Sequence, residues 1–168
     1  MRRIAIQDAN ILIDLVKTGL FDYCMSLEYQ FSSTDIVVEE LYSDQQTIVA
    51  AYIQTGRFII IQIPSVELEH IVALNQEDPR LSIQDCSALY YSLEKNCILL
   101  TGDKRMREFA KKKAIEYYGM FWVLDQLLEN SIITKVQALE FLERLMQVNK
   151  RLPNDEYVKR KTAWQITS

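Results

Sequence analysis

Histidine, cysteine, glycine and proline are all scarce in this chain of 168 residues, which has one, three, four and three of them. The cysteines are odd in number, widely spaced and form no CxxC pair, which argues against a zinc site or a disulfide framework: Cys24, Cys86 and Cys97. With so few glycines and prolines, no stretch has the composition of a linker, and the length suits one domain with a sizeable core. We therefore expect a single domain over residues 1–168, with reduced thiols.

Long apolar runs are missing as well. No run approaches the roughly 20 residues of a membrane span, and Asp8 interrupts the short apolar stretch after Arg3, which argues against a signal peptide. These absences predict a cytoplasmic protein with no membrane partner. The one histidine, His70, lies far in sequence from the acidic residues considered below, so we do not expect a histidine base.

The net charge is -4, which gives no general attraction for nucleic acid. Basic residues nevertheless gather in two segments, 104–113 and 150–161. On charge alone, both segments are expected to be solvent-exposed helix faces. The first one follows Asp103 on the same expected helix and could also meet phosphates.

Apolar strands alternate with amphipathic helices along the chain. Strands are expected at residues 3–7, 58–63, 97–101 and 114–118, and a further unit opens at 32–34. Helices are expected from Asn10, through Glu39–Leu41, and over about 65–75, 82–96, 104–113, 119–130 and 135–149. Such alternation predicts an α/β fold with a mainly parallel sheet covered on both faces. The segment after Pro153 is left unassigned.

Four acidic residues stand at the ends of these expected elements. Asp8 follows the first strand and Asp103 follows the strand at 97–101, and in a parallel sheet such ends meet at one edge. Glu40 and Asp85 are expected near helix starts that can face the same crevice. Four carboxylates in one pocket repel each other, and a hard divalent cation such as Mg²⁺ or Mn²⁺ relieves that repulsion through oxygen ligands.

Each acid also has a purely structural interpretation. Asp8 and Asp103 can be helix N-caps, Asp85 completes a capping box with Ser82, and Glu40 can be an acid in a first helical turn. What favours a metal site is that all four occur together, each at the end of an element.

The motifs around these acids resemble, in order and spacing from Arg3 to Phe121, the four acidic motifs of PIN domains: Asp8-x-Asn10, Val38-Glu39-Glu40-Leu41, Ser82-x-x-Asp85 and Thr101-Gly102-Asp103. The resemblance implies a three-layer α/β/α fold, with a C-terminal helical extension over about 122–168. It also implies a Mg²⁺- or Mn²⁺-dependent endoribonuclease. The implied metal ligands and catalytic residues are Asp8, Glu40, Asp85 and Asp103, with Asn10 and Thr101 as supporting polar residues.

The resemblance extends to the toxin halves of toxin–antitoxin pairs, so it implies an RNA substrate and a small antitoxin protein as partner. The aromatic stretch from Tyr117 to Leu128 leads us to expect a homodimer. Two alternatives stay open. One is a PIN-fold module that binds RNA or protein without cutting it. The other is a receiver-like phospho-switch, which would normally have adjacent acids after the first strand, where Gln7-Asp8-Ala9 supplies only one.

Overall fold

The computed structural model describes residues 2–166, so Met1, Thr167 and Ser168 at the ends of the expected domain lie outside the described residues. Its centre is a five-stranded sheet in the order β3-β2-β1-β4-β5, and every neighbouring pair is parallel. The strands are β1 Arg3–Gln7, β2 Tyr29–Thr34, β3 Phe58–Ile61, β4 Ile98–Leu100 and β5 Tyr117–Tyr118. The predicted parallel sheet is confirmed, although β3 and β5 are shorter than expected and β2 begins before residue 32.

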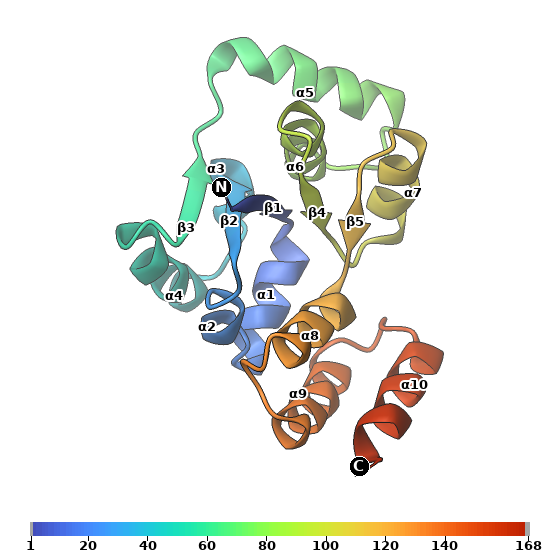
Figure 1. The fold of residues 1–168 in the computed structure, drawn as a ribbon. Coiled ribbons are helices and arrows are strands. Elements are labelled where there is room, and N and C mark those ends of the chain that lie inside the picture. The colour runs from blue at the N-terminus through green and yellow to red at the C-terminus, as the bar shows by residue number, and fades with distance from the viewer. Residues whose placement is uncertain (1, 167–168) are drawn as a thin grey trace.

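Helices cover both faces of this sheet, which confirms the three-layer α/β/α architecture (Figure 1). One face packs against the helices α1 Ala9–Thr18, α2 Phe21–Cys24, α4 Ser43–Gln54, α8 Met120–Glu129 and α9 Lys135–Val148. The other face packs against α5 Ser65–Glu77, α6 Ile83–Glu94 and α7 Lys104–Lys112. The short helix α3 Asp35–Val38 follows β2, and α10 Asn154–Gln165 packs on α9. No helix within residues 2–166 has both the length and the apolar character needed to cross a membrane.

The strand β4 shows why its sequence is apolar throughout. A central strand of a parallel sheet is buried on both faces, so successive side chains enter different cores. Ile98 and Leu100 lie in the core on the α1 side, whereas Leu99 lies in the core on the α6 side. The same alternation places Ala5 and Ile6 of β1 on opposite faces.

The C-terminal extension belongs to the same core as the rest of the domain. Phe141 and Leu142 of α9 are buried in the cluster that also holds residues of β1 and α1. Within the aromatic stretch that motivated the expected homodimer, Phe121 is buried and Trp122 packs against Tyr29 and Tyr118. The chain itself therefore uses these aromatic rings, and the homodimer stays a prediction without that support.

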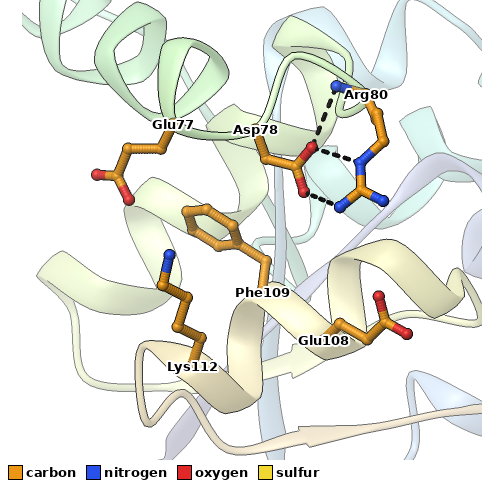
Figure 2. A pocket seen from close by; sticks show the side chains of 6 residues that line it. All are labelled: Glu77, Asp78, Arg80, Glu108, Phe109 and Lys112. Atoms are coloured by element: carbon orange, nitrogen blue, oxygen red, sulfur yellow. Dashed lines mark hydrogen bonds and ion pairs between the residues drawn. The ribbon is translucent and has the colours of Figure 1, made fainter.

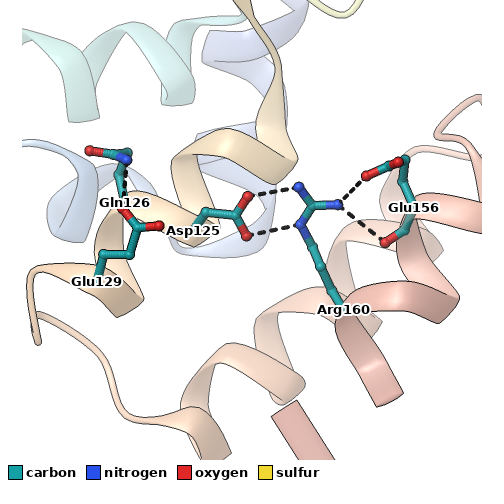
Figure 3. Close-up of polar contacts among 5 residues, drawn as sticks. All are labelled: Asp125, Gln126, Glu129, Glu156 and Arg160. Atoms are coloured by element: carbon teal, nitrogen blue, oxygen red, sulfur yellow. Dashed lines mark hydrogen bonds and ion pairs between the residues drawn. The ribbon is translucent and has the colours of Figure 1, made fainter. Parts of the chain in front are cut away.

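The last helix, α10, is held to α8 by a group of charged side chains (Figure 3). Arg160 donates two hydrogen bonds to the carboxylate of Asp125, at 2.9 and 2.7 Å, and a third to Glu156 at 2.6 Å. Its guanidinium also lies 4.8 Å from the ring centroid of Phe121. No side chain of α10 is fully buried, so polar contacts contribute much of what fixes its position.

Two expectations about helices were wrong or incomplete. The helix expected through Glu39–Leu41 ends at Val38, and Glu39 and Glu40 form a turn, so Glu40 is not an acid of a first helical turn. The helix α4 was not predicted, because Val49 is its one fully buried apolar residue while Ile48 is exposed. Such a helix lacks the apolar stripe from which helices are recognised in a sequence.

Candidate metal centre

The acidic residues meet where the strand order of the sheet reverses. The chain proceeds outward from β1 through β2 to β3, and then returns to β4 on the other side of β1. In open parallel sheets, ligands bind beyond the carboxyl ends of the two strands at this switch point. Asp8 directly follows β1, and its N–H donates to the carbonyl of Leu100 at the end of β4, at 3.1 Å. Asp103 follows β4 and opens α7.

Asp8 is fixed in position by two donors. It is only 3% exposed, and its Oδ1 accepts a hydrogen bond from the N–H of Ile11 at 2.8 Å, as an N-cap of α1 does. Its Oδ2 accepts a hydrogen bond from the hydroxyl of Thr101. Because the Thr101 oxygen also accepts from the N–H of Asp103 at 3.1 Å, Thr101 connects the two aspartates. The supporting role in catalysis that was expected for Thr101 stays a prediction.

Asp85 and Asp103 also have the capping roles that the sequence suggested. Oδ1 of Asp103 accepts from the N–H of Met106 at 2.9 Å, and Oδ2 of Asp85 accepts from the N–H of Ser82 at 3.1 Å. Within residues 2–166, the second oxygen of each carboxylate accepts no hydrogen bond from a backbone N–H. An ionised carboxylate offers about four acceptor sites, so several of them stay available for a cation. Capping therefore orients these side chains and leaves oxygen atoms that can bind a cation.

The aspartates interact electrostatically. Burial raises the pKa of the Asp8 carboxyl to about 7 from 3.8, while the hydrogen bonds from Thr101 and Ile11 oppose this shift. The negative charges of Asp85 and Asp103 add to the increase. An ionised Asp8 thus lacks a positive partner among the described residues, and a bound cation would supply one.

Glu40 is linked to these aspartates only through the charge of Asp85. It is an exposed residue in the turn after α3, yet partial burial of its carboxyl raises its pKa, and the charge of Asp85 raises it further. Asn10 is exposed on the first turn of α1 and lines a hollow together with Asp103. The negative charges of Asp85 and Asp103 therefore act on Asp8, and the charge of Asp85 also acts on Glu40.

A divalent cation fits the chemistry of this donor set, although not as a closed cage of side chains. Within residues 2–166, no group of three or more His, Cys, Asp or Glu side chains is arranged so that it could hold a metal ion directly. Mg²⁺ usually keeps several of its waters and binds one or two carboxylates, which suits an open cluster. The donors here are carboxylate oxygens, which Mg²⁺ and Mn²⁺ prefer.

The sequence missed a second polar group beside this centre. Asp14 of α1 is only 8% exposed, and its Oδ2 accepts a hydrogen bond from Asn149 at 2.8 Å. Burial raises the pKa of Asp14, and the Asn149 hydrogen bond lowers it. With 135 residues between the partners, no local pattern could have revealed this pair.

The fold is a parallel three-layer α/β/α domain with aspartates at the switch point of its sheet, and comparisons with known proteins specify the class. A family model described as DUF3368, a PIN domain, matches residues 4–165. The chain therefore belongs to this family of PIN domains, which are generally nucleases. Its strand order also differs from the 2-1-3-4-5 order of receiver-like folds, which excludes the phospho-switch.

The fold is also found among solved structures. PAE2754 from Pyrobaculum aerophilum aligns with a TM-score of 0.53 at 15% identity, over 79% of this chain and 100% of its own. A PilT N-terminus domain protein, SSO1118 from the hyperthermophilic archaeon Sulfolobus solfataricus P2, aligns with a TM-score of 0.43 at 16% identity, over 75% and 94% of the two chains. At such identities, the first likeness supports the fold alone. No curated protein matches the sequence.

Proposed function

We propose that this protein is a metal-dependent endoribonuclease that hydrolyses phosphodiester bonds of RNA with Mg²⁺ or Mn²⁺. One observation carries the proposal: Asp8 and Asp103 follow β1 and β4 at the switch point of the sheet, and Thr101 is hydrogen-bonded to both of them. Asp85, at the start of α6, adds its negative charge to this pair. The proposed metal ligands are these three aspartates and Glu40, one or two of which would bind the cation directly and the others through its bound waters. Family membership supports nuclease chemistry, and the oxygen-only donor set supports the cation.

The chain's own residues would prepare the site in three ways. Thr101 and the N–H of Ile11 hold Asp8 in one orientation before any ligand arrives. Asp8, Asp85 and Asp103 lie at the N-termini of α1, α6 and α7, whose partial positive charges favour carboxylates and a phosphate group there. When bound, the cation would supply a water that ionises near neutral pH and would neutralise charge on the phosphate oxygens.

Asn10 is suited to a different part of the reaction. It is exposed on the rim of the pocket, next to the hollow that Asp103 also lines. Its side-chain amide can donate a hydrogen bond to a phosphate oxygen and can accept one from a ribose hydroxyl. We assign it to orientation of the substrate.

A labelled single-stranded RNA tests the proposal directly. The wild-type protein should cleave it with Mg²⁺ or Mn²⁺, and excess EDTA should stop the reaction. Asp8→Asn should abolish cleavage because a neutral amide is a poorer ligand, whereas Asp155→Asn, the same change at an exposed site in α10, should not. Equal cleavage by Asp8→Asn and wild type would remove Asp8 from the site, and RNA binding without cleavage would favour the non-cutting module.

The roles as a toxin and as the partner of a small antitoxin protein are finer proposals that rest on the resemblance. Expression of the wild-type protein should then arrest growth, and the product of an adjacent short gene should restore it. Growth that is equal for the wild type and Asp8→Asn would contradict the toxin role while leaving the nuclease proposal intact.

A further inference from the structure

A polar hollow of about 530 Å³ adjoins the candidate metal centre. Its lining contains two acids, Asp14 and Asp103, together with Asn10 and three basic residues, Lys104, Lys150 and Arg151. Lys104 begins α7, whereas Lys150 and Arg151 lie in the loop between α9 and α10. The packing of α9 against α1 brings these distant segments together, so the hollow exists only because the C-terminal extension folds back onto the domain.

The three basic side chains that line this hollow are available to an external anion. All three residues are exposed, and none of them forms an ion pair with a carboxylate within residues 2–166. Other cations of the same basic segment are already paired, Arg160 with Asp125 and Glu156, and Lys161 with Glu143. The basic segment therefore divides into residues that hold α10 and residues that face the hollow.

The loop that carries Lys150 and Arg151 has a defined shape. Asn149 donates from Nδ2 to the buried carboxylate of Asp14 at 2.8 Å, and its Oδ1 accepts from the N–H of Arg151 at 3.0 Å. One side chain thus anchors the loop to α1 and also sets the direction in which the next residues leave α9. A loop fixed in advance loses less conformational entropy when it binds a ligand.

The composition of the hollow indicates which part of a nucleic acid it would contact. Among the described residues that line it, Val148 is apolar and none is aromatic. Bases are usually held by stacking on aromatic rings, whereas phosphates are held by Lys and Arg. The volume is also within the range that holds a ligand of nucleotide size.

We propose that this hollow binds the sugar–phosphate backbone of the RNA strand next to the bond that is cut. The inference rests on the proposed function and extends it, because it assigns substrate binding to the C-terminal extension. Lys104 on one wall and Lys150 with Arg151 on the other contact successive phosphates. Because these contacts reach the backbone alone, binding there does not depend on base sequence.

A second hollow, between α5 and α7, lacks this character (Figure 2). Asp78 and Arg80 pair with each other there, and the remaining charged residues are Glu77, Glu108 and Lys112. Acids thus outnumber bases in its lining, so phosphate gains no net attraction. Replacing Lys112 and its exposed neighbour Lys111 is therefore a matched control, because it also removes two basic side chains but leaves the first hollow unchanged.

The test measures binding of fluorescein-labelled oligouridine and oligoadenine by anisotropy with Mg²⁺ present, in the Asp8→Asn background so that the probe stays intact. Lys150→Ala/Arg151→Ala should weaken both affinities about tenfold or more. The slope of log affinity against log salt should fall by about 1.4, which is two phosphate contacts on a single strand. Lys111→Ala/Lys112→Ala should change neither. Lys104→Ala, on the opposite wall, should lower the slope by about 0.7.

Wild-type cleavage, measured in parallel, separates this inference from the proposed function. If the wild type cleaves RNA and both double variants bind like their parent, the hollow is not the backbone site, and the nuclease proposal stands. If the wild type does not cleave RNA, but Lys150→Ala/Arg151→Ala weakens RNA binding while Lys111→Ala/Lys112→Ala does not, the nuclease proposal fails and the proposed binding site stands. Loss of affinity for only one of the two sequences would contradict backbone recognition. Melting curves of all variants confirm that they are folded.

Discussion

The buried Asp8 should destabilise the metal-free protein once it is ionised, and Asp8→Asn should reveal by how much. Its pKa is about 7 in the folded chain against an ordinary value of 3.8. At about 1.4 kcal/mol for each pKa unit, ionisation of Asp8 costs the folded state roughly 4 kcal/mol at most. Asn caps a helix as well as Asp does, so the variant keeps the hydrogen bond from Ile11 and removes the charge, while an amide NH2 replaces the oxygen that accepts from Thr101.

The sign of the pH dependence follows from proton binding. Between pH 3.8 and about 7, the folded state holds a proton on Asp8 that the unfolded state has lost. The free energy of unfolding of the metal-free wild type therefore falls as pH rises through this window, and the full penalty is present above it. Asp8→Asn has no such group, so the difference between the two proteins should be small near the acidic end and should grow toward pH 8.

Thermal melts in excess EDTA measure this difference. At pH 8 the variant should melt roughly 5 to 15 °C above the wild type, for a gain of about 2 to 4 kcal/mol in a chain of this size. Added Mg²⁺ should stabilise the wild type by mass action and should stabilise the variant less. Asp155→Asn, at an exposed site, controls for the chemical change itself. A variant that is less stable than wild type at pH 8, or a difference that does not vary with pH, would refute the reasoning.

Three other substitutions test separate parts of the structure. Asp103→Asn keeps its cap and should remove the stabilisation by Mg²⁺ or Mn²⁺ seen in melting curves; equal stabilisation of variant and wild type would show that Asp103 is no ligand. Asn149→Ala leaves the buried carboxylate of Asp14 without its hydrogen-bond donor, so it should lower the free energy of unfolding in urea by about 1 to 3 kcal/mol. A smaller decrease at low pH, where Asp14 is neutral, would confirm the cause. Arg160→Lys should lower the melting temperature, because lysine cannot reproduce the two hydrogen bonds to Asp125. RNA cleavage should stay unchanged, and a parallel loss of activity would mean that α10 also shapes the site.

The sequence alone predicted the three-layer α/β/α fold class of this protein, and it supplied the four acids of the candidate site. Apolar runs such as Ile98–Leu100 identify buried parallel strands because both of their faces must leave water. Asp8, Asp85 and Asp103 could be located because strand-to-helix turns need capping residues, and caps occur at fixed offsets from the helix start.

Helices with weak amphipathic character could not be predicted from the sequence. The helices α4 and α10 bury few or no side chains completely, so their apolar residues form no stripe of helical period. The turn at Glu39–Glu40 was missed for a related reason, since good helix formers in a short segment do not show where a helix stops.

Only the tertiary structure decided what surrounds the acids. It showed that Thr101 ties Asp8 to Asp103, because its hydroxyl reaches a carboxylate that is 93 residues away in the sequence. It also placed Asp14 against Asn149, and so brought the basic loop after α9 beside Asp103. Contacts of this kind depend on how helices pack across the sheet, and residues more than 90 positions apart leave no local pattern from which such packing can be read.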